Sequence, residues 1–254
     1  MIIGARAHIV AQAEALAERG FPLMEISVLS AEAFQRDLKR LRSLQETQDI
    51  KFLAHGPEEG KAQDSGFLKN EMLPCINRIT ECLPELGVEL LTIHFWLDRR
   101  FIEPRIIDQK IKLLRLMAEY AAAQGLQLCV ENLSERALDF EQAFGEIESL
   151  GMTLDIGHGE LLSERNTAYD FLAQYLEKIY HIHVHDNQGG NDQSDDLHLL
   201  PGQGIIDFRS ILKVAAGQGY NRTMTLEVEP DHAQQGRQYI QKLWDAVNPP
   251  ERIV

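Results

Sequence analysis

Residues 179–208 read IYHIHVHDNQGGNDQSDDLHLLPGQGIIDF, and this stretch holds four of the nine histidines in the chain. Side chains alternate between the two faces of a strand, so His181, His183 and His185 are expected on one face. The Asn, Gly and Asp residues that follow predict a loop, and PGQG at 201–204 predicts a turn toward a helix. Imidazole and carboxylate are the main N and O ligands of zinc-like and manganese-like ions. The stretch therefore predicts a strand with metal ligands; hydrogen-bonded core histidines and a solvated acidic loop are the alternative.

Short apolar runs alternate with helical stretches on both sides of this segment. Strands are expected at residues 2–6, 21–28, 50–55, 90–96, 127–133, 152–156, 179–185 and 223–228. Helices are expected up to residue 17 and at 31–44, 66–86, 103–124, 139–149, 167–177, 208–216 and 233–247, the second capped by Ser30 and the third interrupted at Pro74 and Pro84. Eight such units predict a (β/α)8 TIM barrel, and no linker divides the chain, so one domain is expected over residues 1–254.

The composition limits the classes of function. The chain has 254 residues, of which 44% are hydrophobic and 25% charged, as in a folded protein with a large core. The formal net charge of -14, without a large basic cluster, disfavours extended nucleic-acid binding. No apolar run predicts a membrane span, and no secretory signal is visible, so a cytoplasmic location is expected. Cys75, Cys82 and Cys129 show no metal-type spacing and are expected to be reduced.

Residues of metal-ligand type stand at the ends of six consecutive predicted strands. In a (β/α)8 barrel these ends meet at the face that carries the active site. Each residue alone is as well explained by a hydrogen bond or a helix cap, but six in succession favour a shared site. Carboxylates that converge without cations would repel one another, so a divalent ion is expected among them. The residues are His55, His94, Glu131, Asp155 with His158, His183 with His185, and Glu227.

These positions carry a family resemblance. The motifs HGP at His55, the strand with His94, VEN at Glu131, LDIGH from Asp155 to His158, HVHDN at His183, DLHLLPGQGIIDF at His198 and LEVEP at Glu227 resemble the xylose-isomerase-like barrel superfamily. That superfamily includes sugar phosphate isomerases and epimerases, ketose 3-epimerases and the DNA-repair enzyme endonuclease IV. The resemblance extends from the first strand to Glu227, and its motifs separate the members of the superfamily poorly.

The epimerase side of the resemblance implies one Mn²⁺, Mg²⁺ or Zn²⁺ ion. Its ligands would be Glu131, Asp155, His183 and Glu227, and the two glutamates would also form the acid/base pair beside the sugar carbonyl. Strand geometry alone favours His185 as the histidine ligand, whereas the family spacing of a histidine three residues before Asp186 selects His183. His181 is then expected deeper in the barrel.

The endonuclease side of the resemblance implies a larger site. His55, His94, His158, Asp196 and His198 would add ligands for up to three ions, and such a cluster suits cleavage of a phosphodiester. Two further alternatives to the isomerase or epimerase are therefore open: a zinc-dependent abasic-site endonuclease, which the acidic charge disfavours, and a non-catalytic metal-dependent sugar-binding barrel.

Residues around this site are expected to bind the substrate, a small sugar or sugar phosphate. The expected binding residues are Arg6, His185, Trp96 and Arg99, because guanidinium groups pair with phosphate or carboxylate and aromatic rings form apolar walls. Arg136, His8 and His232 are weaker candidates that follow other predicted strands. Pairing of two barrels as a homodimer is left open by the sequence.

Overall fold

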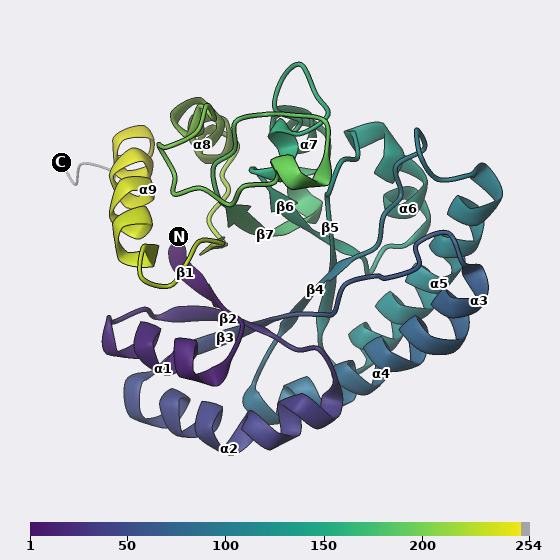
Figure 1. The fold of residues 1–254 in the computed structure, drawn as a ribbon, viewed down its shortest axis with the longest axis horizontal. Coiled ribbons are helices and arrows are strands. Elements are labelled where there is room, and N and C mark those ends of the chain that lie inside the picture. The colour runs from purple at the N-terminus through teal and green to yellow at the C-terminus, as the bar shows by residue number, and fades with distance from the viewer. Residues whose placement is uncertain (250–254) are drawn as a thin grey trace.

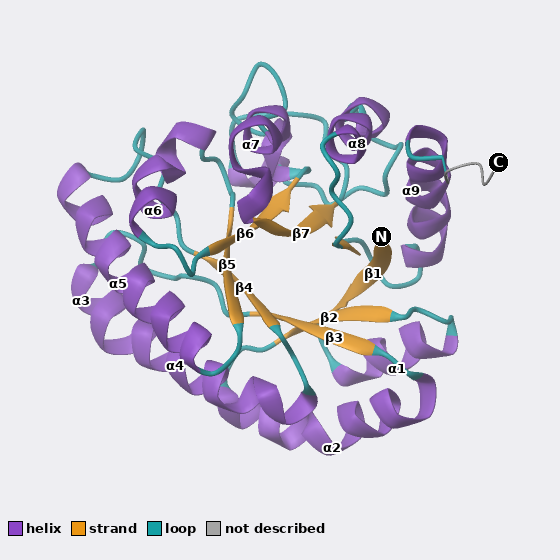
Figure 2. Cartoon of the chain, turned by 180° about the vertical axis from the view of Figure 1, so that it is seen from behind, coloured by secondary structure: helices purple, strands orange, loops and turns teal. Residues whose placement is uncertain are grey.

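Eight parallel strands close into a barrel in which each strand pairs with the next along the chain and β8 pairs with β1. This computed structural model describes residues 1–249. The ring of strands is enclosed by helices, as Figures 1 and 2 show from its two sides. The predicted (β/α)8 barrel is thus confirmed; residues 250–254 of the predicted domain lie outside the described residues. The strands are β1 (Ile2–Ala7), β2 (Leu23–Ser27), β3 (Lys51–His55), β4 (Leu90–His94), β5 (Gln127–Glu131), β6 (Gly151–Asp155), β7 (Ile179–Val184) and β8 (Thr223–Leu226).

The helices follow the strands along the chain and bury apolar side chains against them. They are α1 (Val10–Glu18), α2 (Ala31–Gln48), α3 (Ser65–Phe67), α4 (Leu73–Cys82), α5 (Pro104–Ala123), α6 (Glu141–Glu146), α7 (Ala168–Tyr175), α8 (Phe208–Gly217) and α9 (Ala233–Val247). A π-helical turn (Leu68–Met72) joins α3 to α4, and short 3-10 turns lie at Leu83–Leu86, Ala137–Phe140, His158–Glu160, Leu176–Lys178 and Gln193–Asp195. The Ser30 hydroxyl caps α2 by accepting a hydrogen bond from the backbone N–H of Ala33, as predicted.

Strands β4, β5 and β8 each end two residues earlier than the sequence predicts. Strands β4 and β5 stop two residues short of the expected ends at Trp96 and Leu133. Beyond these ends the backbone N–H groups donate to side-chain carboxylates and not to a neighbouring strand. The N–H of Trp96 donates to Glu59, and the N–H of Leu133 donates to Glu135. As a result, the predicted ligands His94 and Glu131 are the last residues of their strands.

One helical prediction is confirmed and another needs correction. The helix expected at 66–86 is interrupted near both prolines: a π-helical turn gives way to α4 just before Pro74, and α4 gives way to a 3-10 turn at Pro84. The helix expected at 139–149 is wrong in extent, since a 3-10 turn precedes it and α6 ends at Glu146. Among residues 1–249, no helix has the length and apolar character needed to cross a membrane, and all three cysteines are free.

Side chains fill the barrel interior in layers, which places the polar site at one end. Leu23, Leu53, Leu90 and Cys129 form a separate apolar cluster in the strands. A Cβ added at Gly4 would lie 2.8 Å from Cγ of Leu23, so glycine gives this leucine its space. Above them the hydroxyls of Thr92 and Thr153 lie 2.7 Å apart, and the hydroxyls of Thr223 and Thr225 contact the two ring nitrogens of His181.

Candidate metal centre

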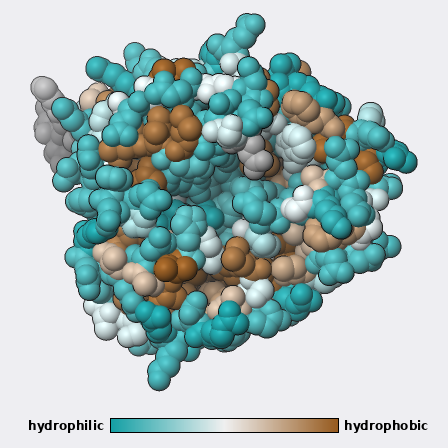
Figure 3. Space-filling model, in the orientation of Figure 1, coloured by the Kyte–Doolittle hydropathy of each residue, from teal (hydrophilic) through white to brown (hydrophobic). Residues whose placement is uncertain are grey.

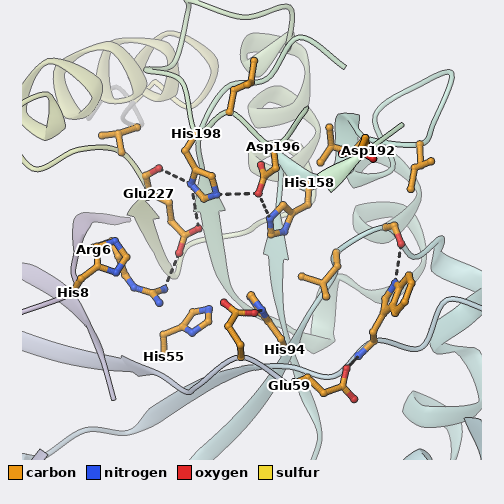
Figure 4. A pocket seen from close by; sticks show the side chains of 18 of the residues that line it. Arg6, His8, His55, Glu59, His94, His158, Asp192, Asp196, His198 and Glu227 are labelled. Atoms are coloured by element: carbon orange, nitrogen blue, oxygen red, sulfur yellow. Dashed lines mark hydrogen bonds and ion pairs between the residues drawn. The ribbon is translucent and has the colours of Figure 1, made fainter. Parts of the chain in front are cut away.

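A cavity of about 950 Å³ opens at the carboxyl ends of the strands. Figure 3 shows it as a hollow with hydrophilic walls in the face seen in Figure 1. Figure 4 shows several of the predicted ligands pointing into it from different strands and loops. Of the predicted site residues, those that line the cavity are Arg6, His8, His55, His94, Trp96, His158, Asp196, His198 and Glu227. Glu131, Asp155, His183 and His185 are fully buried beneath it.

Four predicted ligands converge at the floor of the cavity. One donor atom from each of Glu131, Asp155, His183 and Glu227 lies within 4.8 Å of the others, and this set is called the quartet below. Nδ1 of His183 lies 2.9 Å from Glu131 Oε1, 3.4 Å from Glu227 Oε1 and 3.7 Å from Asp155 Oδ2. The geometry thus brings His183 rather than His185 into the quartet, in agreement with the family spacing.

The carboxylate of Glu131 joins the quartet to a second group of donors. Oε2 of Glu131 lies 3.0 Å from Nε2 of His55 and 3.1 Å from Nε2 of His94. These three residues form a donor group of their own. Both oxygens of Glu131 are therefore engaged, one on each side, so this carboxylate is placed to be shared by two ions.

A third donor group adjoins the quartet at Asp155, which contacts His158 and His185. It consists of His158, His185, Asp196 and His198. Oδ2 of Asp196 lies 3.2 Å from Nε2 of His158 and 3.0 Å from Nε2 of His198, contacts that Figure 4 marks with dashed lines. All nine predicted ligands thus fall into three adjoining groups, and His185 joins them.

The electrostatics of these groups favour a bound cation. Burial would raise the pKa of Glu131, but the charges of His183 and His94 hold it well below its usual range. Burial opposes protonation of His94, yet the charge of Glu131 raises the pKa of that imidazole to about 10. Burial also opposes protonation of His198, but the hydrogen bond that its ring donates to Asp196 and the charge of Glu227 raise the pKa of this imidazole to about 9. The converging carboxylates create a negative electrostatic potential that favours the protonated imidazoles. A bound divalent ion would stabilise the same carboxylates.

Two predicted substrate-binding residues do not line the cavity. The side chain of Arg99 is exposed and lies outside it, whereas the guanidinium of its neighbour Arg100 pairs with Asp98. His185 is fully buried because its ring stacks on that of His198, with centroids 3.9 Å apart. The weaker candidates Arg136 and His232 are exposed and also lie outside the cavity.

Arg6 and Trp96 do line the cavity, but each has a protein partner. The guanidinium of Arg6 donates to Glu227 Oε1 at 2.7 Å and to the hydroxyl of Ser27 at 3.2 Å. The indole N–H of Trp96 donates to the hydroxyl of Ser134 at 2.9 Å. Arg6 is therefore placed to orient Glu227 at least as much as to bind an anionic substrate.

The sequence interpretation missed Glu25, a fully buried residue of β2. Its Oε2 lies 2.8 Å from Nε2 of His183 and 3.3 Å from Nε2 of His181. Burial would raise the pKa of Glu25, but the charge of His183 and the hydrogen bonds from both histidines hold it well below its usual range. A carboxylate that holds the outer nitrogen of a ligand histidine fixes the ring orientation and the tautomer. The available signal was a lone charge inside the apolar run FPLMEISV.

Glu25→Gln is expected to weaken divalent metal binding by about 10–100-fold, the usual cost of losing such an outer partner. The amide keeps a hydrogen-bond acceptor for His183 but removes the charge. Isothermal titration of metal-free protein with Zn²⁺ or Mn²⁺ measures the change. Glu14→Gln, at a partly exposed residue paired with Arg40, is the control and should bind as the parent does. Parent-like affinity in Glu25→Gln would show that Glu25 only fills space.

Comparison with known proteins gives the same family as the motifs. A family model described as xylose isomerase-like TIM barrel matches residues 13–243. An uncharacterized protein of Methanocaldococcus jannaschii is 26% identical over 240 residues, which cover 84% of this chain and 77% of that protein. An inosose dehydratase of Yersinia enterocolitica is 26% identical over 136 residues, 46% of each chain.

Solved structures share the fold over nearly the whole chain. A D-tagatose 3-epimerase-like protein has a TM-score of 0.85 and 23% identity, with 98% of each chain covered. The IolI protein with a bound zinc atom has a TM-score of 0.76 and 17% identity, also with 98% of each chain covered. Because the family model matches most of the length of this chain, the chain belongs to the xylose isomerase-like TIM barrel family.

Proposed function

We propose that the protein is a metal-dependent isomerase or epimerase of a small sugar or sugar phosphate. The observation that carries the proposal is the quartet at the cavity floor, in which Glu227 is the one member that also lines the cavity. A cavity of about 950 Å³ is at the large end of the usual range for small-molecule sites. Membership of the family, and the names of the sugar epimerases with the same fold, support a sugar as the substrate.

The residues fit a divalent ion. Three carboxylates and one imidazole suit Mn²⁺ or Mg²⁺, and Zn²⁺ also accepts such ligands. Nε2 of His183 is held by Glu25, so Nδ1 is the nitrogen that faces the three carboxylates. An ion bound there would polarise the carbonyl and neighbouring hydroxyl of a sugar.

The two glutamates have different access to a substrate. Glu227 has its carboxylate in the cavity wall, where it can take a proton from a carbon beside the carbonyl and return it. Arg6 donates to its Oε1, which leaves Oε2 as the freer oxygen. Glu131 is fully buried, and both of its oxygens are held by imidazoles. Glu227 is therefore the better supported proton carrier, and Glu131 is better supported as a ligand.

The proposal is tested by exchange of substrate hydrogen with deuterium from heavy water. The metal-loaded protein should incorporate deuterium beside the carbonyl of a ketose in a panel of sugars and sugar phosphates, detected by NMR. Glu227→Gln should lower this rate at least roughly a hundredfold, the lower limit for general base catalysis. Glu229→Gln, at an exposed acid in the same cavity wall, is the control. Sugar binding without exchange in the parent would favour the non-catalytic sugar-binding barrel instead.

A second candidate function is cleavage of DNA at an abasic site. The observation that favours it is the presence of three adjoining donor groups, two of which share Glu131, since clusters of ions serve phosphodiester hydrolysis. The net charge of -14 opposes the approach of a polyanion. An abasic oligonucleotide duplex incubated with zinc-loaded protein separates the two: cleavage without sugar exchange would replace the isomerase proposal by the nuclease.

A further inference from the structure

We propose that the substrate carries an uncharged apolar group at the end remote from its carbonyl, and that this group packs on one apolar side of the cavity. This side consists of Trp96, Phe101, Leu133, Leu161 and Leu162, which all line the cavity, and it is called the apolar wall below. The inference rests on the proposed function and narrows it, because it favours a sugar with an apolar substituent over a sugar phosphate.

The apolar wall comes from three consecutive loops of the barrel. Trp96 and Phe101 follow β4, Leu133 follows β5, and Leu161 and Leu162 follow β6. The rings of Trp96 and Phe101 stack with their centroids 5.4 Å apart. Because β4, β5 and β6 are neighbours in the closed ring, these side chains lie on one side of the cavity.

Hydrogen bonds from Arg100 tie these three loops together. Its guanidinium pairs with Asp98 in its own loop and donates to the carbonyl oxygens of Ser134 after β5 and Leu162 after β6. The hydroxyl of Ser134 also accepts from the indole N–H of Trp96. Side chains that are ordered before a ligand arrives lose little conformational entropy on binding, so a preformed wall favours affinity.

The backbone of Leu162 gives independent support. Its φ is 53°, in the left-handed region that bulky side chains rarely adopt. Both of its backbone groups are held, since the N–H donates to the carbonyl of Gly190 at 2.8 Å and the carbonyl accepts from Arg100 at 3.1 Å. Glycine would adopt this conformation without strain, so leucine here costs stability. Its side chain lines the cavity, and contact with a ligand is the function that the strain indicates.

The charges around the cavity oppose a phosphate group. Among the described residues that line it, Arg6 is the one lysine or arginine, and Figure 4 shows its guanidinium directed at Glu227. That contact measures 2.7 Å, so the charge of Arg6 is already paired. Three exposed acids also line the cavity, namely Glu58, Asp192 and Glu229. A phosphate would meet no free guanidinium or ammonium group on these walls, and the acids would repel it.

The histidines of the cavity do not replace the missing cation. Those in the three donor groups are paired with the carboxylates of the same groups. His8 belongs to none of the groups, but burial and the charge of Arg6 lower its pKa below the ordinary value. It is therefore neutral at neutral pH. The part of the substrate that lies away from the quartet is thus expected to be uncharged.

The size and layout of the cavity fit a substrate longer than a monosaccharide. Its volume of about 950 Å³ is at the large end of the range that holds drug-sized ligands. Glu227 directly follows β8, which lies opposite β4 in the ring of eight strands. A substrate that presents its carbonyl end to Glu227 and also contacts Trp96 must therefore span the cavity, with its far end on the apolar wall.

The experiment compares three matched ligands on full-length protein loaded with Mn²⁺. These are the 6-O-benzyl, 6-O-methyl and 6-phosphate forms of each D-ketohexose, which differ only at the end remote from the carbonyl. Fluorescence of Trp96 follows binding, because the other tryptophan, Trp244, is buried in α9. For at least one ketose, the benzyl ether should bind roughly tenfold or more tightly than the methyl ether, the lower limit for added apolar contact in a pocket. The phosphate should bind no more tightly than the methyl ether.

Leu162→Gly tests the apolar wall without straining the fold, because glycine tolerates the left-handed backbone. It should weaken binding of the benzyl ether at least roughly tenfold, change binding of the methyl ether less, and unfold in urea no earlier than the parent. Phe101→Ala, at a side chain that is 44% exposed, should shift the preference in the same direction. Leu138→Ala, at an exposed leucine that does not line the cavity, is the control and should bind all three ligands as the parent does.

Benzyl ethers that bind no more tightly than methyl ethers would overturn the inference, and so would a phosphate that binds more tightly than the benzyl ether. A parent-like preference in both Leu162→Gly and Phe101→Ala would overturn the role of the apolar wall. Deuterium exchange separates these results from the proposed function. A protein that prefers the benzyl ether but exchanges no hydrogen keeps the apolar wall and loses the isomerase proposal. A protein that exchanges hydrogen with the methyl ether or the phosphate alone keeps the isomerase and loses this inference.

Discussion

Lys110→Met is expected to destabilise the folded protein by about 3–5 kcal/mol, because it leaves the buried carboxylate of Glu59 without its partner. Lys110 is fully buried in α5 and donates to Oε1 of Glu59, which is 4% exposed, and to the carbonyl of Ala62. Burial lowers the pKa of Lys110 and raises that of Glu59, and the attraction between their charges opposes both shifts. Urea unfolding, followed by circular dichroism, measures the loss.

Two further variants show whether the charge pair is the cause. Lys51→Met removes an exposed pair with Glu89 and should cost at most about 1 kcal/mol. The double variant Glu59→Gln/Lys110→Met should recover much of the lost stability, because no charge stays buried and glutamine can still accept from the N–H of Trp96. Glu59 lies in the loop after β3. If Lys110→Met unfolds at the same urea concentration as Lys51→Met, the pair of Lys110 and Glu59 does not stabilise this loop more than an exposed ion pair would.

The sequence predicted the barrel well because the strand pattern repeats eight times. Errors in the ends of individual strands and helices did not change the alternation of strand and helix. The residues of metal-ligand type at the strand ends could be read directly from the sequence. His55, His94, Glu131 and Asp155 are each the last residue of their strand in the structure. Convergence of these positions follows from the closed barrel alone, so it needed no knowledge of side-chain packing.

Side-chain direction was the part that the sequence could not give. His183 and His185 stand two residues apart on one strand face, and only the packing shows that one joins Glu131 while the other stacks on His198. Arg99 follows a strand and yet turns to solvent, because its loop is fixed by Asp98 and Asp139. Glu25 was missed for the converse reason: it lies in the middle of β2, away from the strand ends that predict function.

Glu131→Gln is expected to remove more metal than any other single substitution in the site. Its carboxylate belongs to both the quartet and the group with His55 and His94. Nitrogens of four imidazoles lie within 3.4 Å of it: His55, His94, His158 and His183. A neutral amide offers one oxygen in place of two and places an N–H₂ group among these nitrogens, so both groups lose their shared ligand.

Elemental analysis of Glu131→Gln should therefore show the loss of the ions held by the quartet and by the group with His55 and His94. Glu227→Gln is the matched comparison, because Glu227 contributes no donor to the pair formed by His94 and Glu131 and should leave an ion there. Glu229→Gln, which changes an exposed acid of the cavity wall, should lose none. A Glu131→Gln protein with the metal content of Glu227→Gln would mean that the carboxylate serves one ion. Its Oε2 would then be held by the imidazoles of His55 and His94 alone, and the group with these two histidines would be a hydrogen-bonded support for the quartet.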